Sequence, residues 1–180
     1  LRVGRQFSRA WANKPFRILA LAHIFVLFGT AVTSTASASF TRHVLHRPDS
    51  WLGTYYMIST IGAVASMPFW LASSRRFGKK ANYIAAMAAF AIVHLSWLLA
   101  GAADPYALLA GRALLAGFAG GGMILCSYSM LSDAVRYDYI TSGLRREGAF
   151  AGLTSLIDKL AAAASIAGMG AYLSSKGYAA

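Results

Sequence analysis

Five apolar runs dominate this sequence, and each is long enough to cross a lipid bilayer. They cover residues 16–40, 51–71, 83–102, 106–131 and 149–173. A helix of about 20 apolar residues spans the hydrocarbon core, and a helix satisfies its own backbone hydrogen bonds there. The sequence therefore predicts an all-α fold: a polytopic transmembrane bundle of about five helices, forming a single domain over residues 1–180.

The composition agrees with a membrane protein. Hydrophobic residues make up 57% of the chain and charged residues only 13%, whereas a soluble domain carries about 25% charged residues. The net charge of +11 comes from short basic clusters between the apolar runs. Such clusters are typical of topology signals, and they lack the continuous basic or aromatic stripe that nucleic acid requires. Cys126 is the single cysteine, which excludes a cysteine-built metal site. Its position inside an apolar run favours a packing role.

The basic residues predict an orientation. Most of them fall on one side of the membrane, and basic loops stay in the cytoplasm, so the N-terminus is expected inside and the C-terminus outside. The cytoplasmic set comprises Arg2, Arg5, Arg9, Lys14, Arg17, Arg75, Arg76, Lys79, Lys80, Arg136, Arg145 and Arg146, and the outer set comprises Arg42, Arg47 and Lys176.

Asp158 and Lys159 interrupt the middle of the last apolar run. A charge at the bilayer centre costs roughly 2.5–3.5 kcal/mol, so such groups usually face a partner, a cavity or an ion path. A rise of 1.5 Å per residue from Gly148 places Lys159 roughly 16 Å into the membrane. The two side chains point about 100° apart. Asp158 is expected either to pair with Arg112 or to bind a proton.

Polar and small residues in the other runs carry weaker signals. His23 and His94 are expected to be hydrogen-bonded core histidines. Glycines four residues apart, at Gly117 and Gly121 and again at Gly148 and Gly152, predict close helix packing. One helical face of the first run carries hydroxyl groups that suit either a cavity wall or helix–helix hydrogen bonds: Thr30, Ser34, Ser37 and Thr41.

Two charged segments carry a resemblance. In residues 131–148 the matching positions are Asp133, Val135, Tyr137, Asp138, Gly143, Arg145, Arg146, Glu147 and Gly148, and the second segment is residues 75–80. The chain resembles the C-terminal half of the glycoside-pentoside-hexuronide, or melibiose-carrier-like, cation symporters of the major facilitator superfamily. Arg136 and Tyr139 depart from this pattern, because the family usually has acidic residues there.

The resemblance implies that the five runs correspond to helices seven to eleven of a twelve-helix transporter. On this interpretation the chain is a fragment without the N-terminal half and the last helix. The expected function is cation-coupled symport, with Na⁺ or H⁺, of sugars or glycosides by alternating access. A multi-pass protein of the bacterial inner membrane is expected, with the lipid bilayer, a small-molecule substrate and the N-terminal half as partners. We expect no cofactor besides the transported cation, no metal site and no nucleic acid.

The resemblance also implies site residues. Lys159 matches a lysine that lies near the cation-site acids of the N-terminal half, so Lys159 and Asp158 are the expected coupling site. Substrate contacts are expected from Thr154 and Ser155, with Thr30, Ser34 and Ser37. A cytoplasmic gate is expected from Asp133, Asp138, Arg145, Arg146, Glu147, Arg75, Arg76, Lys79 and Lys80, although these residues also suit solvated topology charges.

Other functions remain as alternatives. Ile124 stands where sugar-carrying members can have an aromatic residue, which weakens the case for a galactoside. In one alternative the chain belongs to a carrier of a non-sugar solute such as a lysolipid. In the other it is a membrane scaffold or sensor that transports nothing. An enzyme is not expected, because the sequence offers no nucleophile, base and oxyanion donor gathered near one interface.

Overall fold

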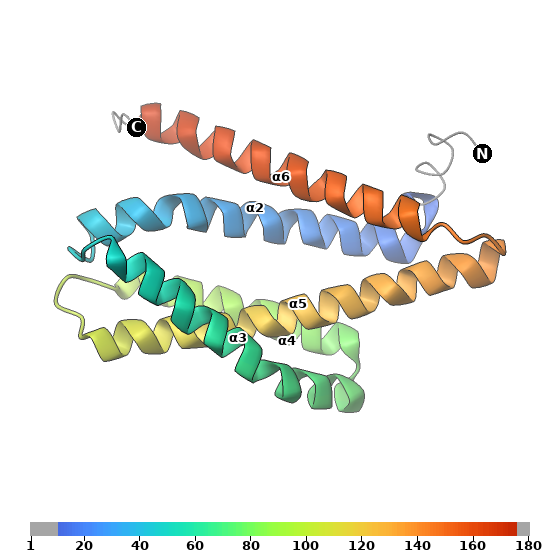
Figure 1. The fold of residues 1–180 in the computed structure, drawn as a ribbon, viewed down its shortest axis with the longest axis horizontal. Helices are drawn as coiled ribbons and strands as arrows, with labels where there is room; N and C mark the ends of the chain where they lie inside the picture. The colour runs from blue at the N-terminus through green and yellow to red at the C-terminus, as the bar shows by residue number, and fades with distance from the viewer. Residues whose placement is uncertain (1–10, 176–180) are drawn as a thin grey trace. The chain divides into compact units, whose positions relative to one another are not determined.

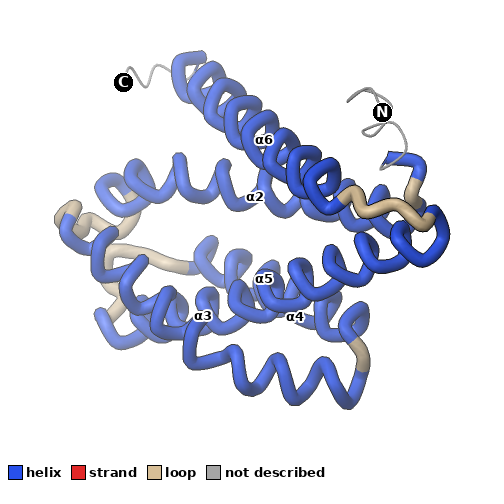
Figure 2. Tube along the Cα trace, turned by 45° about the vertical axis from the view of Figure 1, so that its right-hand side comes forward, coloured by secondary structure: helices blue, strands red, loops and turns tan. Residues whose placement is uncertain are grey.

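The computed structural model describes residues 11–175, in which long helices account for nearly all of the chain (Figure 1). These are α2 (Lys14–His43), α3 (Ser50–Phe77), α4 (Lys79–Ser96), α5 (Tyr106–Ser142) and α6 (Glu147–Ser175), with a short 3-10 helix, η1 (Trp97–Leu99), after α4. Five helical segments in this part of the chain are long and apolar enough to cross a membrane. The described residues form no strand (Figure 2). The predicted all-α membrane fold is confirmed.

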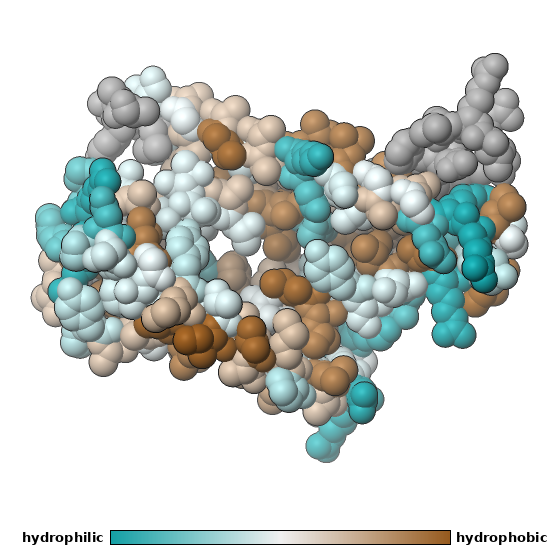
Figure 3. Space-filling view, viewed as in Figure 1, coloured by the Kyte–Doolittle hydropathy of each residue, from teal (hydrophilic) through white to brown (hydrophobic). Residues whose placement is uncertain are grey.

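The apolar side chains on the outside of these helices explain why the chain needs a lipid environment. Phe25 is 74% exposed, and Val64 and Ile92 are exposed to a similar degree. Hydrophobic residues lie openly on the molecular face drawn in Figure 3. Exposed apolar area on this scale marks a surface that contacts lipid or another protein.

Four basic residues used for the predicted orientation, Arg2, Arg5, Arg9 and Lys176, lie outside the described residues. The orientation itself stays a prediction.

The chain divides into two compact units. Unit 1 comprises residues 1–36 and 131–180, and unit 2 comprises residues 37–130. Unit 1 therefore contains most of α2, the last part of α5 and all of α6. Unit 2 contains the end of α2, all of α3 and α4, and most of α5.

In unit 1, α2 and α6 run in the same direction (Figures 1 and 2). Their contact begins at the rings of Phe16 and Phe150, which meet edge to face with centroids 4.9 Å apart. Ala20 and Ala134 complete this buried cluster. Asn13 begins α2 as a cap, because its side chain accepts the Phe16 backbone N–H at 3.1 Å.

In unit 2, α3 and α5 approach so closely that their backbones touch. A Cβ atom on Gly117 would overlap the carbonyl oxygen of Ser59, and one on Gly121 would overlap the Ser66 hydroxyl. Trp70 closes this contact by donating its indole N–H to the Phe118 carbonyl at 2.8 Å. The predicted packing role of Gly117 and Gly121 is confirmed. Gly148 makes no such contact with another described helix, and its packing role stays a prediction.

The helices are longer than the apolar runs. The fourth apolar run ends at residue 131 and the fifth begins at residue 149, but α5 continues to Ser142 and α6 begins at Glu147. Similarly, residues 72–82 lie between the second and third apolar runs, but Gly78 alone separates α3 from α4. Its φ of 86° reverses the chain in one residue. Hydropathy marks where a helix leaves the lipid, whereas a helix ends where its backbone hydrogen bonds stop.

Candidate transport site

A histidine and a carboxylate meet between two membrane-crossing helices of unit 1. The Nε2 atom of His23 on α2 lies 2.8 Å from Oδ1 of Asp158 on α6. His23 lies nine residues after Lys14, the first residue of α2, and Asp158 lies eleven residues after Glu147, the first residue of α6. These spacings correspond to about 14 Å and 16 Å along the two parallel helices, so both groups reach a similar depth.

The helix register explains why these two residues meet. His23 follows Phe16 by seven residues and Asp158 follows Phe150 by eight, which is about two helical turns in each case. Because the rings of Phe16 and Phe150 are in contact, the next side chains along the same stripe are His23 and Asp158. The aromatic contact therefore positions the polar pair.

The pair is only partly covered within the chain. The His23 side chain is 27% exposed and the Asp158 side chain 45% exposed. The Nε2–H of neutral His23 donates to the carboxylate, and a protonated ring adds a positive charge to the same contact. An anion in lipid is costly without a partner, so His23 stabilises Asp158 at this depth.

One sequence-based expectation for Asp158 is wrong. We expected a possible ion pair with Arg112, but Arg112 Nη1 lies 2.8 Å from Oδ2 of Asp104. His23 was expected to be hydrogen-bonded, and it is, although its partner is a carboxylate. The signal that indicates this pair is the equal depth of two titratable residues on helices that enter the membrane from the same side.

Lys159 differs from its neighbour. It is exposed, and it makes no hydrogen bond or ion pair with another residue in the described part of the chain. An exposed ammonium near the middle of a membrane helix needs a partner from elsewhere, such as a carboxylate or an anionic solute.

Two of the five predicted substrate residues are bonded to their own helices. Thr154 donates its hydroxyl to the Phe150 carbonyl at 2.9 Å, and Thr30 does the same with Val26 and Leu27 at 3.0 Å. Ser34 and Ser155 are exposed. Such hydroxyls keep lone pairs that can still accept a hydrogen bond from a solute. Their substrate role stays a prediction.

The last predicted substrate residue, Ser37, belongs to unit 2. Its hydroxyl lies 3.4 Å from Oη of Tyr56, which joins α2 to α3. This contact matches the alternative in which the hydroxyls hold helices together. Thr41, further along the same face, is buried.

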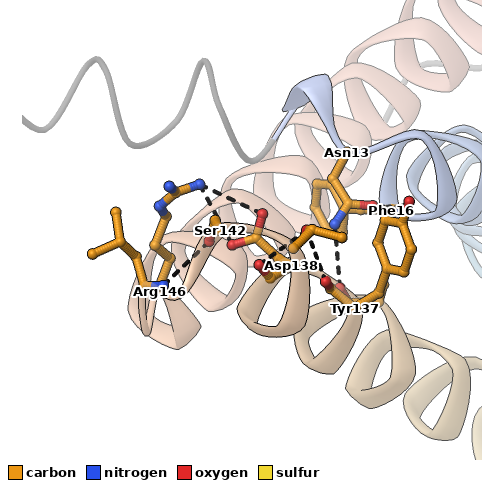
Figure 4. A network of polar contacts seen from close by, with 9 residues as sticks. Asn13, Phe16, Tyr137, Asp138, Ser142 and Arg146 are labelled. Atoms are coloured by element: carbon orange, nitrogen blue, oxygen red, sulfur yellow. Dashed lines mark hydrogen bonds and ion pairs between the residues drawn. The ribbon is translucent and has the colours of Figure 1, made fainter.

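Among the predicted gate residues, the structure joins Asp138 to Arg146 (Figure 4). Arg146 Nη1 lies 3.5 Å from both carboxylate oxygens, and the two side chains are 9% and 8% exposed. The Nε atom of Arg146 is buried without a hydrogen-bond partner in the described residues. Nearby, Asn13 on α2 donates to the Ala134 carbonyl of α5 at 3.2 Å. These contacts connect the start of α2, the end of α5 and the start of α6.

The other gate residues are arranged differently. Arg145 lies over the Tyr139 ring at 5.7 Å, and Glu147 occupies the first turn of α6, where an acidic side chain is favourable. Asp133 is exposed on α5. The remaining four belong to unit 2 and flank Gly78: Arg75, Arg76, Lys79 and Lys80.

Sequence reasoning missed a second polar cluster, at the opposite end of unit 2 from Gly78. Arg47 donates to the Asp104 carbonyl at 2.8 Å and stacks over the Tyr106 ring at 4.1 Å. The Asp104 carboxylate accepts from Arg112, which lies 5.7 Å from the Trp97 ring centroid. The cluster ties the loops that follow α2 and η1 to α5.

Comparison with known proteins places the chain among transporters. All of it, residues 1–180, matches the family described as MFS/sugar transport protein. An Escherichia coli (strain K12) protein named "Putative 2,3-dihydroxypropane-1-sulfonate exporter" is 28% identical over 147 residues, and a Salmonella typhimurium (strain LT2) protein of the same name is 27% identical. The match covers 80% of this chain and 31% of each relative, so the chain spans about a third of their length. No solved structure matches it. The chain therefore belongs to the MFS/sugar transport protein family of the major facilitator superfamily.

Proposed function

We propose that this chain forms the C-terminal half, up to the eleventh helix, of a cation-coupled symporter for a small hydroxylated solute. Helices α2–α6 then correspond to helices seven to eleven of a twelve-helix carrier. The observation that carries the proposal is the pair of charged residues in the middle of α6. Asp158 is held by His23, and Lys159 is exposed beside it. Midplane charges between membrane helices are typical of the ion and substrate paths of secondary transporters.

The substrate class follows from the groups around Lys159. An ammonium attracts an anionic or oxygen-rich solute, and the hydroxyls of Thr154 and Ser155 lie about one turn before it on α6. The named solute of the two bacterial relatives is a sulfonate with two hydroxyl groups. Sugars, glycosides, uronides and hydroxylated sulfonates all share this chemistry, so they are the solutes to test.

The proposed cytoplasmic gate rests on the Asp138–Arg146 pair. Removing one partner of a buried ion pair leaves a buried charge without compensation, which makes such a pair suitable as one side of a two-state device. In our proposal the pair, with Arg145, Glu147, Asp133 and the basic residues around Gly78, stabilises the state that is closed on the inside.

Lys159→Ala in the full-length transporter tests the proposal. The transporter is reconstituted in proteoliposomes and supplied with three labelled solutes: melibiose, methyl glucuronide and 2,3-dihydroxypropane-1-sulfonate. Wild-type protein should accumulate at least one of them, and Lys159→Ala should lower that accumulation about tenfold or more. Lys14→Ala, which removes an exposed charge outside the apolar run, is the matched control and should accumulate normally.

The same measurement separates the alternatives. A lysolipid carrier or a non-transporting scaffold would move none of the three polar solutes, even in solute exchange without a gradient. Wild-type accumulation by Lys159→Ala would instead show that this lysine is only a structural or snorkelling residue.

A further inference from the structure

We propose that the His23–Asp158 pair is the site at which this chain binds the coupling proton. The inference rests on the proposed function and deepens it, because it selects the proton as coupling ion and names the residues that carry it. The pair joins α2 to α6 at 2.8 Å and lies within the first half of each of these two membrane-crossing helices. Imidazole is the side chain that gains and loses a proton near neutral pH.

The pair changes its net charge by one when it binds a proton. Without the proton, neutral His23 donates its Nε2–H to the Asp158 carboxylate, and the pair carries a charge of −1. With a proton from a hydronium ion on Nδ1, the pair is an imidazolium and a carboxylate with no net charge. One O–H bond of the hydronium breaks, one N–H bond forms, a water molecule is released, and nothing is oxidised or reduced. Because an unbalanced charge is costly away from water, the charges beside the pair decide which form is stable when the site closes.

Lys159 connects this step to solute binding. It follows Asp158 directly on α6 and lies at nearly the same depth. When the pair is unprotonated, its negative charge balances the Lys159 ammonium. When the pair is protonated, that ammonium is left to attract an anionic or oxygen-rich solute. Proton and solute then stabilise the same closed state, which is the condition for coupling.

The other charged and titratable groups that the structure describes in unit 1 lie mostly near the start of α2, the end of α5 and the start of α6. They are Lys14 and Arg17 on α2, Asp133, Arg136, Tyr137, Asp138 and Tyr139 on α5, Arg145 and Arg146 in the loop before α6, and Glu147, Lys159 and Tyr172 on α6. Of these, Asp138 is already paired with Arg146. Lys159 is the charged group nearest in depth to the pair, so its ammonium is the group most affected by the change in the charge of the pair.

The same geometry disfavours sodium at this position. A hard cation needs several oxygen ligands in place of its water shell. One Asp158 oxygen already faces the His23 ring, so this carboxylate has one oxygen left for a metal ion. A proton needs only the ring nitrogen and the carboxylate.

The decisive variant is His23→Gln in the full-length transporter, tested with the same three solutes. A pH gradient, acid on the side of the solute, should drive accumulation in wild-type protein. His23→Gln should lower this accumulation about tenfold or more and keep solute exchange without a gradient. His94→Gln is the matched control, because the His94 ring is bonded to the Phe90 carbonyl and not to a carboxylate. Asp158→Asn should behave as His23→Gln does, and Asp158→Glu should restore part of the accumulation.

A second readout does not depend on accumulation. A pH electrode should record proton uptake when solute is added to wild-type vesicles, and His23→Gln should abolish it. Proton uptake therefore tests the inference even if the substitution also weakens solute exchange. A His23→Cys, Asp158→Cys double variant in a Cys126→Ala background should form an oxidative cross-link, which checks the contact itself.

The outcomes separate the two proposals. If wild-type protein accumulates solute with a sodium gradient but not a pH gradient, or if His23→Gln accumulates as wild type does, the proton site is overturned and symport stands. If wild-type protein exchanges none of the three solutes, the proposed function fails and the proton site fails with it.

Discussion

The two units hold their helices together in opposite ways. In unit 2, α3 and α5 touch through backbone atoms, since Cβ atoms on Gly62 and Gly117 would overlap carbonyl oxygens of the facing helix. In unit 1, α2 and α6 meet through large side chains at Phe16 and Phe150, and then through a polar pair. Helices with ordinary side chains between them lie about 8–10 Å apart, and small residues allow a closer approach.

This difference decides what can lie between the helices. The glycine contact of unit 2 leaves no room for a charged side chain, a proton path or a solute. The aromatic contact of unit 1 leaves enough space between α2 and α6 for the His23 and Asp158 side chains to meet there. In our proposal, the close glycine contact supports the part of the transporter in which the charges change. Four predictions test the comparison, from the largest expected effect to the smallest.

Phe16→Ala should be the most damaging of the four. Removing a buried ring and leaving a cavity costs about 3–5 kcal/mol of unfolding free energy. Denaturant unfolding in detergent micelles would measure it. Phe25→Ala is the control, because Phe25 is 74% exposed and its removal should lower the unfolding free energy much less. Equal losses for the two variants would mean that the aromatic contact does not hold unit 1.

Gly117→Ala tests the backbone contact of unit 2. The added methyl group has no space beside Ser59, so we expect a loss of about 1–3 kcal/mol. Gly111→Ala on the same helix has open space and should gain up to about 1 kcal/mol from better helix propensity. The comparison would break if both substitutions stabilised the protein equally in the same unfolding assay.

Trp70→Phe should have a smaller effect. It keeps a ring between α3 and α5 but removes the hydrogen bond to the Phe118 carbonyl, which is worth about 1 kcal/mol. Trp11→Phe, at an exposed position, is the control for changing a tryptophan. Thermal unfolding of the two variants would show whether unit 2 depends on this bond in addition to its glycines.

The smallest effect is expected at the exposed Arg42–Asp49 pair of unit 2. The Arg42 guanidinium donates hydrogen bonds to Asp49 and holds the pKa of that carboxyl below its ordinary value. Its stabilising contribution is therefore present above the ordinary Asp pKa of about 4 and is lost as the pH falls through the lower, folded value. The unfolding temperature of Asp49→Asn should lie slightly below that of the wild type at pH 7, and the two unfolding temperatures should converge in acid. A gap that widens in acid would contradict this sign.

The sequence predicted the helices well because lipid imposes a simple rule on them. Each apolar run had to become a helix, and the spacing of Gly117 and Gly121 indicated close packing. It did not predict that α5 continues to Ser142, since charged residues outside the lipid are compatible with a helix. It also did not predict the His23–Asp158 contact. Helical periodicity places a residue on a face, but which faces meet depends on packing between distant segments.

Gly78 has a consequence for how the chain sits at a lipid surface. With one residue between α3 and α4, Arg75, Arg76, Lys79 and Lys80 are confined to the tip of a single hairpin. Ser73 and Asn82 are hydrogen-bonded across the turn, and Asn82 also bonds the Gly78 carbonyl, so the tip is clasped. Four cations that cannot spread apart repel one another, and anionic headgroups relieve this repulsion by about 1 kcal/mol for each basic residue. We therefore expect the basic tip to stay at the headgroup level and to limit how deeply the hairpin enters the bilayer.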